Sequence, residues 1–259
     1  MRKAGRIWNS WLNRVQVSGG STANMKTFYS MVYHTLLGPT ICSDVNGKYP
    51  GADGKIHELR KGHLMYSNFS GWDIYRSEAQ FLAMIAPRHS SDMAQSLLLD
   101  YQQGGTFPRW PVPNMDSGVM MGDPAAPIIA DFYAFGARDF DVKGAFDGLM
   151  RAATDTTVYA PLAHTYERDA LGAYLKLGYV PEHQKGGYGC VSMTLEYGAA
   201  DFALSRMATS LGRKSDAGLL LNHAQDWKNL YNPATGYLQM KELNGDWTQG
   251  SPALIQLNQ

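Results

Sequence analysis

The residue best suited to acid chemistry is Glu196, in the stretch GYGCVSMTLEYGAADFALSRM from Gly187 to Met207. Apolar residues recur there every three or four positions, which predicts a helix with two neighbouring apolar rows. The first row contains Val191, Leu195, Ala199 and Phe202, and the second contains Met193, Ala200, Ala203 and Met207. Glu196 falls inside the second row, where a charged carboxylate is costly unless it is paired or protonated. A protonated glutamic acid in a cavity is the usual form of a general acid.

A structural role for Glu196 is also open. The side chain could be tied to an arginine, or it could lie at the edge of the apolar stripe and reach water. Burial would favour its protonated form, whereas a helix N-terminus near Cys190 would favour its charged form. Four polar residues hold the opposite face of this predicted helix, namely Thr194, Asp201, Ser205 and Thr209.

The composition narrows the class of partner. The chain has 259 residues, 44% hydrophobic, which allows one large domain or two small ones. Its formal net charge of zero argues against a nucleic acid and against an anionic membrane surface. An uncharged partner fits better, and 6 Trp and 15 Tyr suit sugar rings, which stack on aromatic faces. The seven histidines form no metal-spaced pair.

Compartment is not fixed by the sequence. Cys42 and Cys190 are equally compatible with one disulfide and with two buried thiols. The N-terminus has no apolar run typical of a secretory signal, and no stretch is long enough for membrane insertion. As written, the chain would stay in the cytoplasm; the alternative is a piece of a longer exported protein.

The spacing of apolar residues and helix breakers predicts a mostly helical chain. Helices are expected over residues 7–15, 24–37, 72–85, 90–103, 128–137, 142–153, 168–177, 191–211 and 215–230. Asn24 is expected to cap the second of these, and Ser90 or Ser91 the fourth. Turn dipeptides predict hairpins within residues 44–54 and 237–247, and residues 106–127 form a long loop that is typical of function. Helical pairs in series with long loops suggest an α/α toroid, left open because a closed (α/α)6 ring needs twelve helices.

Three acidic or amide residues lie in the first predicted hairpin. Asp44, Asn46 and Asp53 loosely resemble a calcium loop, but the spacing of an EF-hand is absent. We interpret them as turn residues.

Several motifs occur together in one order. They are YSNFSGWDIYRSE at residues 66–78, GTFPRWPVPNMDSGVMMGD at 105–123 and GCVSMTLEY around Glu196. With residues 27–57 and 177–184, they resemble glycoside hydrolase family 92, whose members are calcium-dependent, inverting, exo-acting α-mannosidases. The resemblance runs from about Ile7 to Trp247, nearly the whole chain.

The resemblance implies an N-terminal β-sandwich followed by an (α/α)6 catalytic domain. Residues 1–259 then correspond to the N-terminal part of that catalytic domain, an all-α, incomplete (α/α)6 toroid with short β-hairpins in its loops. Glu196 takes the position of the general acid, and Trp72 and Asp73, near Phe69, take positions in the sugar pocket. The general base and most calcium ligands are expected outside this chain.

Other residues carry alternatives. Trp72 could be core at a helix start, and Asp73 could complement a helix dipole. Trp110 could present its ring to a sugar or pack its own loop, and Asp116 could contact substrate or form a turn. We favour a structural ion pair of Arg76 with Asp73 or Glu78.

The function implied is removal of terminal α-linked mannose, such as α-1,2-linked mannose, from a mannose-containing glycan with inversion. Inversion needs a second carboxylate about 6.5–9.5 Å from the acid to activate water. No such base is apparent, and Asp73 is expected to hold sugar hydroxyls, so the chain alone should hydrolyse mannosides barely or not at all. A non-catalytic carbohydrate-binding remnant and a fragment that does not fold alone are the alternatives. By resemblance, the location is extracellular or periplasmic.

Overall fold

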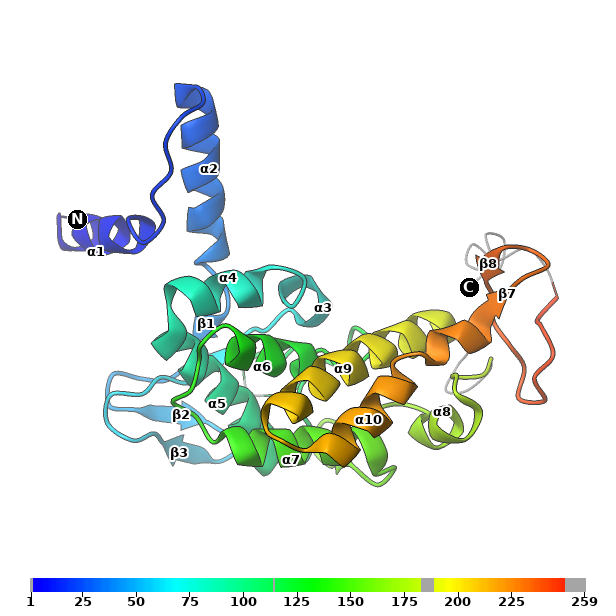
Figure 1. Ribbon diagram of the computed structural model, residues 1–259. Coiled ribbons are helices and arrows are strands. Elements are labelled where there is room, and N and C mark those ends of the chain that lie inside the picture. Colours follow the sequence, from blue (N-terminus) through cyan, green and yellow to red (C-terminus); the bar gives the residue numbers. More distant parts are fainter. Residues whose placement is uncertain (1, 114, 183–188, 250–259) are drawn as a thin grey trace.

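The computed structural model describes residues 2–113, 115–182 and 189–249. Helices dominate it and strands occur only as short pairs, which confirms the predicted all-α class (Figure 1). The helices are α1 (Arg2–Leu12), α2 (Thr22–Thr35), α3 (Gly71–Ile74), α4 (Glu78–Ile85), α5 (Pro87–Gly104), α6 (Ala125–Ala134), α7 (Val142–Thr154), α8 (Leu171–Leu177), α9 (Cys190–Ser210) and α10 (Lys214–His223), with a 3₁₀ helix at Asp226–Leu230. No helix in the described part is long and apolar enough to cross a membrane.

The strands form four antiparallel pairs in the described part of the chain. These are β1 (Thr40–Ile41) with β4 (Tyr66–Ser67), β2 (Lys48–Pro50) with β3 (Ile56–Glu58), β5 (Tyr159–Ala160) with β6 (Thr165–Tyr166), and β7 (Tyr231–Asn232) with β8 (Tyr237–Leu238). The β2–β3 pair is the hairpin predicted from Asp53–Gly54, with Tyr49 opposite His57. An isolated bridge between Lys241 and Trp247 encloses the turn expected at Asn244–Gly245.

The main core lies between α4, α5, α6, α7 and α9. Leu97, Ile129, Leu149 and Leu204 are fully buried there. A smaller cluster around Tyr174 and Tyr197 joins α8 to α9. Helix α9 packs on α6, α7 and α10, whereas α1 and α2 project away from this body at the top of Figure 1. Helix α1 contains no buried residue, and only Val32 is buried in α2.

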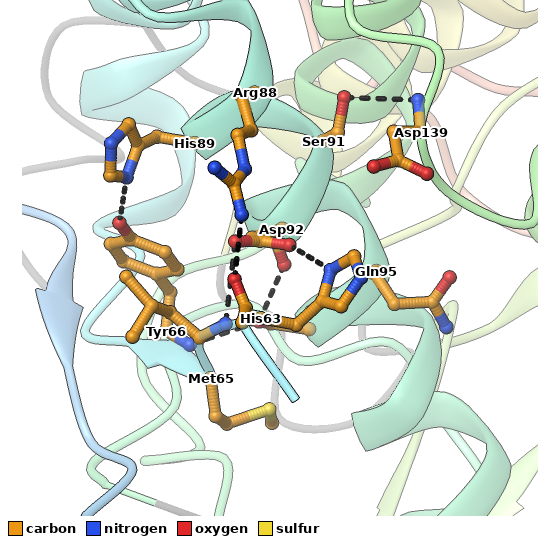
Figure 2. A network of polar contacts seen from close by, with 12 residues as sticks. His63, Met65, Tyr66, Arg88, His89, Ser91, Asp92, Gln95 and Asp139 are labelled. Carbon is orange, nitrogen blue, oxygen red and sulfur yellow. Dashed lines mark hydrogen bonds and ion pairs between the residues drawn. The ribbon is translucent and has the colours of Figure 1, made fainter. Parts of the chain in front are cut away.

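A polar network fixes the segment that leads into β4, shortly before α3 (Figure 2). His63 Nδ1 lies 2.7 Å from Asp92 Oδ1 on α5, and the Leu64 amide donates to Asp92 Oδ2 at 3.3 Å. The Tyr66 amide donates to Ser96 Oγ at 2.9 Å, and its hydroxyl lies 2.8 Å from His89 Nδ1. Because these partners all lie on α5, the chain enters α3 from a fixed position.

Several predicted helix boundaries are wrong because capping and turn chemistry override apolar spacing. Helix α2 begins at Thr22, where Ser21 Oγ, rather than Asn24, caps the helix by accepting the Asn24 amide at 3.1 Å. Helix α5 begins at Pro87 and not after Ser90 or Ser91, because proline needs no N–H partner in a first turn. The helix expected over 72–85 is broken between Ile74 and Glu78. The helix expected over 215–230 ends at His223.

The polar face of α9 is buried, contrary to the usual reading of polar residues as solvent-facing. Thr194, Asp201 and Ser205 are at most 2% exposed, whereas Leu195 and Phe202 from the first apolar row are 37% and 51% exposed. Thr194 and Ser205 bond to carbonyls of α9, whereas Asp201 pairs with Arg168 from a distant segment. Thr194 Oγ1, for example, donates to the Cys190 carbonyl and accepts from the Val180 amide. The helix therefore turns its hydrogen-bonded polar side into the molecule.

Candidate active site

Glu196 lies in the second turn of α9, and its side chain is 15% exposed. Tyr75 Oη donates to Glu196 Oε2 at 2.7 Å, and Arg76 Nη2 lies 3.5 Å from Glu196 Oε1. The carboxyl group is thus neither fully buried nor free in water. It is held on one oxygen by a hydroxyl and approached on the other by a guanidinium that is itself 58% exposed.

The break between α3 and α4 places these two partners. Burial, and after it the neighbouring Glu196, raises the pKa of Tyr75, so its hydroxyl remains a donor. Because α3 ends at Ile74, Arg76 does not sit one helical turn from Asp73, and the favoured pairing with Asp73 or Glu78 is wrong. The guanidinium instead turns to Glu196 on α9. One alternative for Glu196, a carboxylate near an arginine, is therefore also present in the structure.

The long loop between α5 and α6 closes against Glu196 through a glycine. Gly122 has φ +92°, and a Cβ at this position would lie 2.5 Å from the Cβ of Glu196. At Gly71, the first residue of α3, a Cβ would lie 2.7 Å from the Arg109 carbonyl oxygen. These two contacts bring the loop against α9 and α3, and only glycine allows the approach.

A buried ion cluster fixes the end of this loop. Arg168 Nε donates to Asp123 Oδ2 at 3.0 Å, and Arg168 Nη1 lies 2.8 Å from Asp201 Oδ1 on α9. All three side chains are inaccessible to solvent. No spacing pattern in the sequence marks this cluster, because its members lie in three separate segments of the chain. Asp123 directly follows Gly122, so the cluster also fixes the position of Gly122 beside Glu196.

The residues predicted in the loop organise it. Asp116 is a nearly buried side chain that accepts the amides of Arg109, Trp110 and Gly118 at 3.2, 3.3 and 3.2 Å. This bonding fits the alternative of a turn residue. Trp110 is half-buried, and its indole Nε1 donates to Asn68 Oδ1 at 2.7 Å. Its contact with a sugar stays a prediction.

The predicted pocket residues Phe69, Trp72 and Asp73 lie in three different surroundings. Phe69 is fully buried in the main core. Trp72 is half-buried, and its Nε1 is buried without a hydrogen-bond partner among the described residues. Asp73 is exposed and accepts the Ser70 hydroxyl at 2.6 Å.

Asp73 also faces a second carboxyl group. With Glu78 it lines a hollow of about 350 Å³ beneath α2, and Glu196 does not line this hollow. Burial, and after it the charge of Asp73, raises the pKa of Glu78 to about 7. Asp73 and Glu78 therefore line one hollow, whereas Glu196 contacts Tyr75 and Arg76 elsewhere.

The comparisons with known proteins decide the family. The model of the glycosyl hydrolase family 92 catalytic domain matches residues 1–255. This chain belongs to glycosyl hydrolase family 92. The comparison with curated proteins found no match.

Two solved family 92 structures show how much of the domain is present. The inverting mannosidase BT2199 from Bacteroides thetaiotaomicron VPI-5482 shares 30% identity at a TM-score of 0.86, over 97% of this chain and 33% of that chain. The α-mannosidase BT3965 from Bacteroides thetaiotaomicron, in complex with mannoimidazole, shares 27% identity at a TM-score of 0.87, over 96% and 31%. This chain thus spans about a third of the length of these relatives, which agrees with an incomplete family 92 toroid.

Calcium, which the family resemblance implies, does not fit the described surroundings of Glu196. Within residues 2–113, 115–182 and 189–249, no three or more His, Cys, Asp or Glu side chains gather to hold a metal ion. Neither Cys42 nor Cys190 forms a disulfide, and burial raises the pKa of the Cys42 thiol to about 11. A disulfide between Cys42 and Cys190 is therefore absent.

Proposed function

We propose that this chain is the acid-bearing part of a family 92 α-mannosidase that releases terminal α-linked mannose with inversion. The observation that carries the proposal is the position of Glu196, held by Tyr75 at 2.7 Å and flanked by Gly122. In this role Glu196 protonates the leaving oxygen of the glycosidic bond, and a water attacks from the opposite face of the sugar. A mannose-containing glycan is the substrate class.

The second carboxylate is proposed to come from sequence outside these 259 residues. The chain spans about a third of the length of solved family members, and Asp73 lines a different hollow from Glu196. Asp73 is then available to bind sugar hydroxyls, with Trp72 beside it in α3. Turnover of mannosides by this chain alone is expected to be very weak, because loss of one catalytic carboxylate removes several orders of magnitude in rate.

Binding of mannoimidazole tests the site without requiring turnover. This ligand was bound by a relative of this chain, and its imidazole nitrogen can accept a proton or hydrogen bond from a carboxylic acid. By isothermal titration calorimetry, Glu196→Ala should weaken binding about tenfold or more. Glu58→Gln, at an exposed position in β3, should leave it unchanged.

The outcomes separate the candidate functions. No binding by a chain that unfolds cooperatively would refute a retained mannose site. Binding that Glu196→Ala leaves unchanged would favour a carbohydrate-binding remnant over an acid-bearing site. Appreciable hydrolysis that Glu196→Gln abolishes would support the acid and overturn the expectation that the base lies outside the chain.

A further inference from the structure

Tyr75 lies where its hydroxyl can fix the orientation of the Glu196 carboxyl group. It belongs to the short connection between α3 and α4, and its half-buried ring packs against the main core. The hydroxyl donates to Glu196 Oε2 at 2.7 Å. The ring therefore anchors Tyr75 in the core, whereas the hydroxyl is directed to a carboxyl group on another helix.

The backbone of Tyr75 is itself held in place by Gln80. The Gln80 side-chain nitrogen Nε2 donates to the Tyr75 carbonyl at 2.8 Å and to Asp131 Oδ2 at 2.5 Å. Gln80 lies in the first turn of α4, and Asp131 lies on α6. Because α6 packs on α9, these two bonds hold the connection between α3 and α4 in position relative to Glu196 before any ligand binds.

The two oxygens of the Glu196 carboxyl group have different neighbours. Oε2 accepts the Tyr75 hydroxyl at an ordinary O–H···O distance. Oε1 lies 3.5 Å from Arg76 Nη2, at the outer limit of a hydrogen bond, and that guanidinium is 58% exposed. An exposed pair of this kind contributes little to stability, so the guanidinium can move aside. Oε1 is therefore the less firmly held of the two oxygens.

We propose that Tyr75 is a positioning residue that directs the acid proton of Glu196 onto Oε1. A neutral carboxyl group has one hydroxyl oxygen and one carbonyl oxygen, and the carbonyl oxygen is the better acceptor. While Tyr75 donates to Oε2, that oxygen is the carbonyl, and the proton is on Oε1. Tyr75 has this role only if Glu196 is the acid, as proposed above.

In the reaction, the proton on Oε1 is the one that leaves Glu196. The Oε1–H bond breaks, its electron pair stays on Glu196, and the proton goes to the glycosidic oxygen. That oxygen keeps the electron pair of its bond to the sugar carbon and leaves as an alcohol. Water forms the new bond from the opposite face and gives its proton to the second carboxylate, proposed above to lie outside these 259 residues. The Tyr75 hydroxyl then stabilises the Glu196 carboxylate through a charge-assisted hydrogen bond.

A double-mutant cycle with mannoimidazole tests whether Tyr75 acts through Glu196. Tyr75→Phe keeps the ring in the core and removes only the hydroxyl. By isothermal titration calorimetry, it should weaken binding about fivefold in the otherwise wild-type chain. In the Glu196→Ala background, the same change should leave the dissociation constant unchanged. The matched control is Tyr29→Phe, which removes a hydroxyl bonded to the Val15 carbonyl at 3.1 Å and should bind as the wild type does.

The outcomes separate the positioning role from the proposed function. If Tyr75→Phe weakens binding equally in both backgrounds, Tyr75 contacts the ligand or supports the fold, and the positioning role is overturned. If Tyr75→Phe changes binding in neither background while Glu196→Ala still weakens it, the acid site stands and the role of Tyr75 is overturned. If Glu196→Ala itself leaves binding unchanged, the proposed function fails, and the role of Tyr75 fails with it.

Infrared spectroscopy tests the position of the proton without a ligand. Under acidic conditions in which circular dichroism shows a folded chain, subtraction of the Glu196→Gln spectrum isolates the carbonyl stretch of protonated Glu196. Tyr75→Phe should move this band to higher frequency, because the carbonyl oxygen loses its hydrogen-bond donor. Tyr29→Phe is again the control and should leave the band in place. A band that Tyr75→Phe also leaves in place would mean that Oε1 is the carbonyl oxygen, and it would overturn the proposal.

Discussion

The surroundings of Glu196 depend on which atoms can approach it. Tyr75 donates a hydrogen bond to Glu196, and Gly122 can lie close to Glu196 because it has no side chain. A side chain at position 122 would occupy the space beside the Glu196 carboxyl group, so glycine keeps that side of the carboxyl group open. The backbone at Gly122 is in the left-handed region, which favours glycine for a second reason.

Gly122→Ala should weaken both folding and binding. The added methyl would collide with Glu196 at 2.5 Å, and the residue would keep φ +92° at a cost of about 1–3 kcal/mol. Gly118→Ala is the matched control, because Gly118 has φ +71° with no atom within 4 Å of its added Cβ. Urea unfolding and mannoimidazole titration should show a larger loss for Gly122→Ala. Equal losses would mean that backbone strain alone acts.

Glu78→Gln should stabilise the chain at alkaline pH. The folded-state pKa of Glu78 is raised from 4.5 to about 7. Its contribution to stability is therefore present below pH 4.5 and is lost as pH rises through about 7. The variant should gain about 1–2 kcal/mol over wild type at pH 8, allowing for partial solvent access, and nothing at pH 4. Thermal melts across this range measure the difference, and a gain independent of pH would contradict the assignment.

At the scale of elements, Arg168 connects the loop end at Asp123 to α9 at Asp201. Replacing it by methionine would leave two buried carboxylates without their cation. Arg168→Met should cost about 3–5 kcal/mol of unfolding free energy. Arg151→Met is the matched control, because Arg151 is 59% exposed in a surface pair with Asp155 and should cost less than about 1 kcal/mol. Similar costs in chemical denaturation would show that the cluster does not hold the loop.

The sequence predicts where most helices lie, but it does not predict which face of a helix is buried. The apolar period placed α5, α6, α7 and α9 nearly correctly, because long periodic segments are a strong signal. The buried face of α9 differs from the predicted one because Asp201 pairs with Arg168, which lies more than 30 residues earlier in the chain. A polar residue that is paired across the fold looks in the sequence like one that faces water.

The same limit applies to the site. The motif TLEY and its family resemblance point to Glu196, whereas its hydrogen-bond partner Tyr75, only two residues after Asp73, has no feature in the sequence that points to this contact. The helix break that turns Tyr75 and Arg76 toward α9 contains no proline or glycine, so the sequence does not predict it. Asp123 ends the motif of residues 105–123 and Asp201 lies on the predicted polar face, but no spacing links either of them to Arg168.

At the scale of the whole molecule, the core is shielded from solvent, whereas some outer helix faces expose large apolar side chains. Large apolar side chains stay exposed on α9 and α10, namely Leu195, Phe202, Leu219 and Leu221. The core residues of α6 and α9 are meanwhile almost inaccessible. Exposed apolar faces of this kind are typical contact surfaces, so we expect them to be covered in a longer family 92 chain.

Two phenylalanines on neighbouring helices test this division. Phe132 on α6 is fully buried, so Phe132→Ala should cost about 3–5 kcal/mol in this chain. Phe202 on α9 is 51% exposed, so Phe202→Ala should change stability by less than about 0.5 kcal/mol and should reduce self-association in sedimentation velocity. In a longer chain that covers α9, the cost of Phe202→Ala should rise above about 1 kcal/mol, because the ring would then be buried. An unchanged cost in the longer chain would mean that this face of α9 remains in solvent there as well.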